Sequence, residues 1–209
     1  MEVVVMPVGL LEANSYIIYD QEGKEAAVID PGGDGESIIN EINSRKLQLK
    51  YILLTHGHFD HIDAVGLLKD RIGGQIAIHK EDADSLGDSH KNLSSALGRH
   101  SIQPQADRLL EHGDSLMIGN IELKVIHTPG HSLGSLCFLT EGAVFTGDTL
   151  FRGSIGRTDF SGGDMDQLLN SIKENLLPLD KKTLVYPGHG PKTTIGNEKV
   201  TNPFLEGLI

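Results

Sequence analysis

The sequence predicts a mixed α/β protein in which helices cover the faces of β-sheets. Two observations support this fold class. Short runs rich in Val, Ile and Leu end at Gly, Pro, Asp or Asn, which is typical of buried strands. Between them lie longer stretches whose apolar residues recur at helical spacing. Strands interspersed with helices in this way indicate sheets against which helices pack.

Nine runs are expected to be strands and three stretches to be helices. The strands are residues 3–5, 16–19, 26–30, 51–55, 75–79, 121–128, 136–140, 143–146 and 183–187. The helices are residues 36–46, 62–72 and 165–177, the last of them stopped by Pro178. The polar segment 85–104 is expected to be an excursion near a functional site. With no repeat, low-complexity segment or linker, residues 1–209 are expected to form a single domain.

Composition excludes several classes of protein. The chain is 38% hydrophobic and 22% charged, which is ordinary for a globular protein. Its net charge of -11 argues against a nucleic-acid partner, because such binding needs Lys and Arg to neutralise phosphates. The N-terminus has no leader pattern and no apolar run approaches the ~20 residues of a membrane span. A single cysteine, Cys137, excludes an internal disulfide, and we expect a cytoplasmic protein without membrane contact.

The run Thr-His-Gly-His-Phe-Asp-His at residues 55–61 is the densest group of metal-ligand types in the chain. His56 and His58 are two apart, so an extended backbone can direct both to one side. Asp60 and His61 follow at the start of a helix and point elsewhere. Four ligands within six positions fit poorly around one tetrahedral ion, so the spacing favours two ions sharing the cluster.

Three further candidates follow the same pattern. His131, Asp148 and His189 each lie just after an apolar strand and beside a glycine. Functional side chains on loops held by a rigid sheet fit this arrangement. Three further histidines, His79, His112 and His127, lack such a pattern and are expected to be structural or surface residues.

These segments resemble the metallo-β-lactamase superfamily. Thr-His-Gly-His-Phe-Asp-His, Thr-Pro-Gly-His-Ser, Thr-Gly-Asp-Thr-Leu and Pro-Gly-His-Gly occur in the family's order between residues 55 and 190. The resemblance implies a four-layered αββα sandwich and two divalent metal ions, with Zn²⁺ the first expectation and Fe or Mn also compatible. It implies one metal held by His56, His58 and His131, another by Asp60, His61 and His189, and Asp148 bridging both.

The resemblance also implies a hydrolase that uses a metal-bridging hydroxide and no side-chain nucleophile. We expect Asp60 to have a second, catalytic role, in which it orients that hydroxide. Cys137 lies in an apolar run and is expected to be a small buried hydrophobe.

Residues 150–160 and the tail after Pro187 resemble the glyoxalase II-like branch, in its short bacterial hydroxyacylglutathione hydrolase type. This implies a small-molecule thioester substrate such as S-lactoylglutathione. Longer members have a helical C-terminal domain for glutathione, which we do not expect here. Arg152, Arg157 and Lys192 are candidates for binding an anionic substrate, although Arg157 could equally pair with Asp159.

Three alternatives are weighed against this interpretation. Antibiotic hydrolysis is disfavoured, because class B β-lactamases commonly have Cys where Asp148 stands. A mononuclear iron persulfide dioxygenase shares the Gly-Arg-Thr-Asp-Phe run and stays open as a second hypothesis. A non-enzymatic binding module is the third, disfavoured by the presence of all seven ligands. The sequence does not indicate an oligomeric state.

Overall fold

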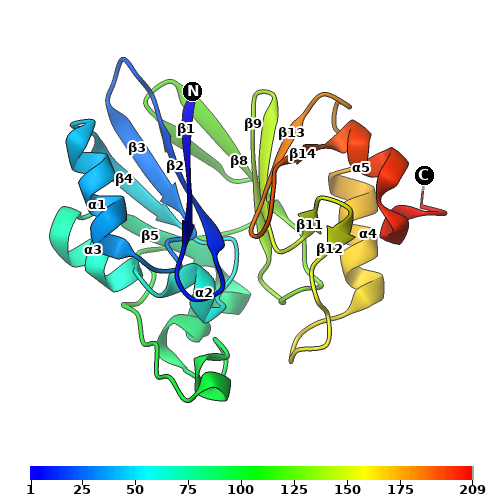
Figure 1. Cartoon of the computed structure of the whole chain (residues 1–209), viewed down its shortest axis with the longest axis horizontal. Coiled ribbons are helices and arrows are strands. Elements are labelled where there is room, and N and C mark those ends of the chain that lie inside the picture. Colours follow the sequence, from blue (N-terminus) through cyan, green and yellow to red (C-terminus); the bar gives the residue numbers. More distant parts are fainter. Residues whose placement is uncertain (209) are drawn as a thin grey trace.

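A computed structural model describes residues 1–208, and two six-stranded sheets form its centre (Figure 1). The first sheet has the order β1 (Glu2–Val8), β2 (Ala13–Tyr19), β3 (Glu25–Ile29), β4 (Gln48–Leu53), β5 (Gln75–His79) and β6 (Arg108–Leu110). The second has the order β14 (Thr193–Thr194), β13 (Leu184–Pro187), β10 (Ala143–Gly147), β9 (Leu136–Thr140), β8 (Ile121–His127) and β7 (Ser115–Ile118). A small hairpin joins β11 (Leu150–Phe151) to β12 (Ser154–Ile155).

Three apolar cores hold four layers together. One lies between α1 (Gly35–Ser44), α3 (Val65–Ile72) and the first sheet. The second lies between the sheets, around the fully buried Phe138 and Phe145. The third lies between the second sheet and α4 (Met165–Asn175) with α5 (Ile195–Thr201). Figure 1 shows the helices on the two outer faces, so the expected αββα sandwich is confirmed. No helix of residues 1–208 is long and apolar enough to span a membrane.

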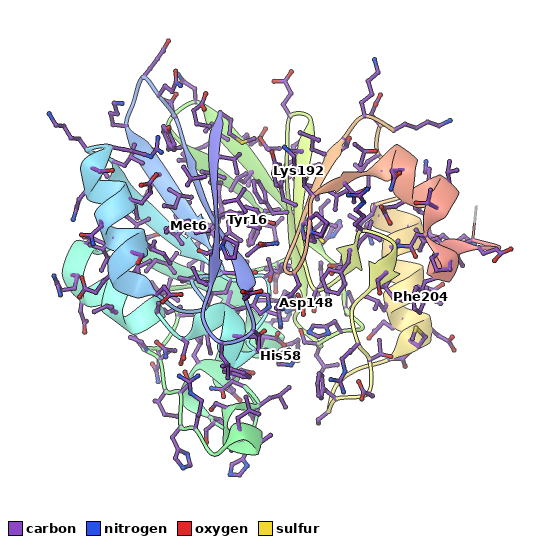
Figure 2. All side chains as sticks on the ribbon, viewed as in Figure 1. Met6, Tyr16, His58, Asp148, Lys192 and Phe204 are labelled. Atoms are coloured by element: carbon purple, nitrogen blue, oxygen red, sulfur yellow. The ribbon has the colours of Figure 1, made fainter. Side chains whose placement is uncertain are left out.

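Strand direction brings the ends of several strands to one edge. β4 runs parallel to β3 and β5, and β10 runs parallel to β13. The two sheets are joined at this edge, where the Leu136 N–H donates to the Thr55 carbonyl at 2.7 Å. The Tyr16 hydroxyl, from β2, donates to the Pro187 carbonyl at the end of β13 at 2.6 Å. Figure 2 shows His58 and Asp148 where the two halves of the molecule meet.

The expected helix over residues 62–72 is wrong in extent, because the chain forms two helices there. α2 (Phe59–Ile62) ends after one turn, and α3 begins at Val65. The Ala64 N–H donates to the Pro31 carbonyl at 2.9 Å instead of continuing the helical ladder. This tertiary bond interrupts the helix and fixes the turn that holds Asp60 and His61.

Several elements were not anticipated from the sequence. They are the short strands β6, β7, β11, β12 and β14, the helix α5, and three 3₁₀ helices, η1 (Lys80–Gly87), η2 (Ser94–Leu97) and η3 (Pro203–Leu205). Both η1 and η2 lie in or beside the polar excursion, which is the green segment below α2 in Figure 1.

Gly32 tests how tightly α2 is packed against the turn after β3. A Cβ added to Gly32 would overlap the Asp60 carbonyl oxygen, which is backbone and cannot move cheaply. We expect Gly32→Ala to lower the free energy of unfolding by about 2–4 kcal/mol, measured by urea denaturation. Gly87→Ala is the control, because its Cβ would meet nothing within 4 Å and its φ is not left-handed. Equal stability of the two variants would contradict the packing described.

Candidate metal centre

Three buried histidines form the first group of candidate ligands. His131 Nε2 lies 3.0 Å from His58 Nδ1 and 3.3 Å from His56 Nε2. The three nitrogens belong to loops after β4 and β8, one in each sheet. Tetrahedral ligands bound to zinc at about 2.0–2.1 Å lie roughly 3.3 Å from one another. The group therefore has the dimensions of one metal site.

Asp60, His61 and His189 form the second group. His61 Nε2 lies 3.3 Å from His189 Nε2, and Asp60 Oδ2 lies 3.3 Å from His189 Nε2 and 3.6 Å from His61 Nε2. Asp60 and His61 project from the single turn of α2, whereas His189 follows β13. The spacing again matches ligands around one ion.

Asp148 lies between the two groups. Its Oδ2 is 3.6 Å from His131 Nε2, in the first group, and its Oδ1 is 3.4 Å from His61 Nε2, in the second. Oδ1 is a buried oxygen for which the described residues offer no hydrogen-bond partner. Gly188 lies against the same oxygen, where a Cβ would overlap it. An unpartnered buried carboxylate oxygen costs free energy, and a cation between the groups would supply the missing partner. The donor set thus fits two metal ions.

The pKa values of the histidines differ according to their neighbours. Burial lowers the pKa of His58 to about 3, so its imidazole is neutral and free to ligate. Burial also lowers the pKa of His61, but three carboxylates outweigh burial and raise that pKa to about 10. The three are Asp148, Asp60 and Asp30. The surroundings of His61 therefore favour positive charge, a preference that a divalent cation at Nε2 would satisfy.

Asp30 is a functional residue that the sequence reasoning missed. It follows β3 and has φ 51°, in the left-handed region. Its Oδ2 accepts hydrogen bonds from His61 Nδ1 at 3.0 Å and from the Thr55 hydroxyl at 2.6 Å. Its Oδ1 accepts from the Thr55 N–H at 2.7 Å. With both oxygens engaged, Asp30 orients His61 rather than offering a further ligand. Its position just after an apolar strand was the signal that could have found it.

Asp82, in η1, fixes the loops of the first group relative to each other. Its Oδ2 accepts from the Gly57 N–H at 3.1 Å and from the Ser132 hydroxyl at 2.7 Å. Its Oδ1 accepts from the Gly134 N–H at 2.8 Å. The loop that carries His56 and His58 is thus tied to the loop that carries His131. Nothing in the local sequence marks Asp82 for this role.

A cavity of about 460 Å³ opens onto the ligand groups. Its lining includes five of the seven candidate ligands and a set of apolar side chains. The lining residues are Leu11, His58, Phe59, Asp60, Leu93, Ala96, Leu97, His131, Asp148, Phe151, Arg157, Phe160 and His189. Ligand sites are typically concave and mostly apolar with a few convergent polar groups, as here.

The three candidate substrate-binding residues are placed differently. Arg157 lines the cavity, but its guanidinium binds Asp159 through two hydrogen bonds of 2.9 and 2.7 Å and lies over the Phe160 ring at 4.3 Å. Its carbonyl accepts the His131 Nδ1–H at 2.7 Å. Arg152 and Lys192 are exposed and lie outside the lining. In Figure 2 Lys192 lies well apart from His58 and Asp148.

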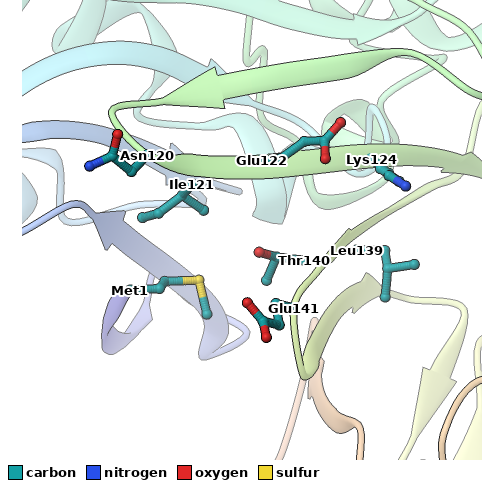
Figure 3. Close-up of a pocket in the computed structure, with 8 residues that line it drawn as sticks. All are labelled: Met1, Asn120, Ile121, Glu122, Lys124, Leu139, Thr140 and Glu141. Atoms are coloured by element: carbon teal, nitrogen blue, oxygen red, sulfur yellow. The ribbon is translucent and has the colours of Figure 1, made fainter.

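A larger hollow, of about 650 Å³, lies elsewhere (Figure 3). It is lined by Met1 and by residues near the β7–β8 and β9–β10 turns, including Glu122 and Glu141. These turns are at the opposite ends of the strands from the ligands. None of the candidate ligands lines it, so chemistry rather than size identifies the site.

Two groups outside the ligand set are explained by packing. Cys137 is fully buried in β9, and burial raises the pKa of its thiol to about 11. His79 and His127 stack on each other, with ring centroids 4.1 Å apart and planes 12° from parallel. Neither of these two histidines belongs to a candidate metal group among the described residues.

Comparisons with known proteins agree with this geometry. Residues 8–189 match the profile of the family described as the metallo-beta-lactamase superfamily. The hydroxyacylglutathione hydrolase GloC of Haemophilus influenzae is 40% identical, with 98% of each chain covered. The solved structure of the BLEG-1 B3 metallo-beta-lactamase is 44% identical, covers 99% of this chain and 100% of its own, and has a TM-score of 0.95. The di-iron-bound TTHA1623 structure is 37% identical, covers 98% and 100%, and has a TM-score of 0.85.

Asp148 is expected to be needed for metal binding but not for folding. We expect Asp148→Ala, loaded with Zn²⁺ and desalted, to hold about one ion or fewer per chain, because the carboxylate shared by both groups is gone. The unsubstituted chain should hold about two, measured by elemental analysis. Asp159→Ala is the control, since Asp159 is exposed and pairs only with Arg157. Two ions retained by Asp148→Ala would contradict a bridging role.

Asp30→Asn tests the orienting role of that carboxylate. The amide offers one acceptor oxygen where the carboxylate offers two, so at least one of three donors, the Thr55 N–H, the Thr55 hydroxyl and the His61 Nδ1–H, faces an NH2 group instead of an acceptor. We expect the affinity for the more weakly bound metal ion to fall about 10–100-fold, measured by competition with a chromogenic chelator. Asp107→Asn, a surface carboxylate paired with Lys69, should leave the affinity unchanged.

Proposed function

Because the chain belongs to the metallo-β-lactamase superfamily, we propose that this metallo-hydrolase cleaves small thioesters at a site of two divalent metal ions. One observation supports the proposal most directly. The carboxylate of Asp148, with a buried oxygen that lacks a partner among the described residues, lies between two ligand groups at the base of one cavity. We propose His56, His58 and His131 as one ligand set and Asp60, His61 and His189 as the other, with Asp148 shared.

Bound divalent ions would supply a hydroxide at neutral pH and polarise the substrate carbonyl. The chain supplies position and charge. Asp60 is a carboxylate at neutral pH: burial raises its pKa, but the neighbouring His61 and His189 lower it well below its usual range. Asp60 lines the cavity, and its carboxylate can accept a hydrogen bond from an attacking water. We therefore propose that Asp60 orients the nucleophile.

A side-chain nucleophile is not needed and is not offered by the cavity. Cys137 lies in a core cluster outside the lining and its raised pKa keeps the thiol protonated. The lining has no Ser, Thr, Lys or Tyr within residues 1–208. A leaving thiolate, with a pKa near 8.5, departs without protonation, whereas an alkoxide needs an acid. Apart from the proposed ligands, Arg157 is the one ionisable side chain that the described residues place in the lining of this cavity, so thioesters, whose leaving group needs no acid, suit it.

The names of the relatives support thioester substrates and also indicate which other substrates and metals should be tested. GloC is named as a hydrolase of hydroxyacylglutathione, which is a thioester. The similar BLEG-1 structure is described as a B3 metallo-beta-lactamase, so lactam substrates belong in the test. We propose Zn²⁺ as the first metal to load, with Fe or Mn as alternatives, since TTHA1623 is described as di-iron-bound. We further propose that residues 1–209 form a single domain.

Thiol release from S-lactoylglutathione and simple acyl thioesters, followed with a thiol reagent, tests the proposed reaction. We expect metal-loaded protein to turn over thioesters and Asp148→Ala to lose on the order of 10³-fold or more in kcat/KM, since the shared metal ligand is lost. Glu36→Ala is the control here, because Glu36 is exposed and pairs with Arg71 outside the cavity lining. Faster cleavage of a chromogenic cephalosporin than of any thioester would contradict the proposal. So would oxygen consumption with glutathione persulfide by protein holding one iron.

A further inference from the structure

Apart from Arg157, the cavity wall away from the ligands is apolar, and it reaches the surface. Leu11, in the turn between β1 and β2, and Leu97, at the end of η2, line the cavity from different elements. Their exposed fractions are 47% and 51%, high for large apolar side chains beside a polar centre. Phe160 adds a ring that contacts His58 edge-on, with centroids 5.6 Å apart. A solvent-exposed apolar patch around a cavity indicates a ligand-binding surface.

Leu93 strengthens this interpretation because its backbone is strained. Its φ of 67° is in the left-handed region, which a branched side chain rarely adopts. Asn92 fixes the strained segment. Its side-chain amide donates to the backbone carbonyls of Ser85 at 3.0 Å and Ser101 at 2.7 Å. Its backbone carbonyl accepts the Phe59 N–H at 2.9 Å. The strain places a leucine in the cavity wall, and backbone strain of this kind concentrates at functional sites.

A second cavity, also of about 460 Å³, begins on the other side of Leu93. It shares His58 and Leu93 with the first cavity but is otherwise lined largely by polar side chains, among them Glu81, His90 and Lys91. A substrate whose reacting carbon lies at the ligand groups thus meets two different environments. One arm can enter the apolar cavity, while the other passes His58 into the polar one.

We propose that the thioester substrate carries an apolar acyl group, bound by Leu11, Leu93, Leu97 and Phe160, and a polar thiol group directed past His58. This inference rests on the proposed thioester hydrolysis. Both arms of a thioester begin at the reacting carbonyl carbon, so the polarity of the two cavities assigns the arms. Glutathione, the thiol in the name of the relative GloC, is a charged peptide and suits the polar cavity, which leaves the acyl group to the apolar one. A lactoyl group, with its hydroxyl, would leave this apolar wall largely unused.

A series of thioesters with one thiol and a lengthening acyl chain tests the proposal. We use N-acetylcysteamine thioesters of acetyl, butanoyl, hexanoyl and lactoyl groups with metal-loaded protein. A fully buried methylene is worth up to about fourfold in kcat/KM. We therefore expect hexanoyl to exceed acetyl and lactoyl by at least about tenfold. A parallel series with one acyl group and increasingly apolar thiols should show no such rise.

Two variants and a matched control locate the effect. Leu97→Ser should reduce the hexanoyl-to-acetyl ratio of kcat/KM at least about threefold, because a hydroxymethyl group replaces the apolar wall. Ile102→Ser should leave the ratio unchanged, since Ile102 is 58% exposed in the same excursion but does not line the cavity. Leu93→Gly should reduce the ratio without lowering the midpoint of urea unfolding, because glycine adopts a left-handed φ without strain.

The outcomes separate this inference from the function on which it rests. If metal-loaded protein hydrolyses no thioester, the proposed function fails, and the inference with it. If it hydrolyses acetyl, lactoyl and hexanoyl thioesters equally well, the function stands and the acyl preference is overturned. A rise with apolar thiols in place of acyl chains overturns the assignment of the arms. An unchanged ratio in both Leu97→Ser and Leu93→Gly overturns the assigned wall.

Discussion

Holding seven ionisable side chains together inside the protein is the constraint on which the rest of the structure depends. Imidazoles and carboxylates lose hydration when buried, and each must recover it through hydrogen bonds, opposite charge or a metal. His61 illustrates the point, being fully buried with Asp30 on one ring nitrogen and Asp60 and Asp148 near the other. Without these carboxylates its burial would be unfavourable. Buried polar residues such as Asp30 and Asp82 therefore support the proposed ligands through hydrogen bonds.

The two sheets meet this constraint jointly. The first sheet supplies His56 and His58 after β4, whereas the second supplies His131, Asp148 and His189 after β8, β10 and β13. Each of the two proposed ligand sets therefore draws residues from both halves. Cross-sheet hydrogen bonds, such as that from the Tyr16 hydroxyl to the Pro187 carbonyl, set the separation of the halves. A shift of one sheet by an ångström would move ligands out of metal-binding range, so the interior packing and the site are coupled.

Features that depend on neighbouring residues in the sequence could be predicted, whereas features that depend on contacts between distant residues could not. The proposed ligands His56, His58 and Asp148 lie in short runs beside strand ends, and the local sequence pattern predicts such placement. Asp30 had the same kind of signal, after an apolar strand, but no neighbouring motif. The helix over residues 62–72 was expected whole because periodicity does not report the Ala64–Pro31 hydrogen bond, which joins residues far apart in sequence. Asp82 was likewise beyond reach, since its partners lie 25 to 52 residues away.

The surroundings of the site divide into a rigid part and an adaptable part. The ligands are supported by buried acceptors such as Asp30 and Asp82, whose hydrogen bonds leave little freedom. The apolar wall comes instead from a surface turn and the polar excursion, elements that pack less into the three cores. Leu11 and Leu97 are half exposed, so substitutions there cost little stability, whereas a change at Asp82 would break three buried hydrogen bonds. In our proposal the reaction chemistry depends on the rigid part and substrate fit on the exposed wall, so one metal framework can serve different substrates through changes in its loops.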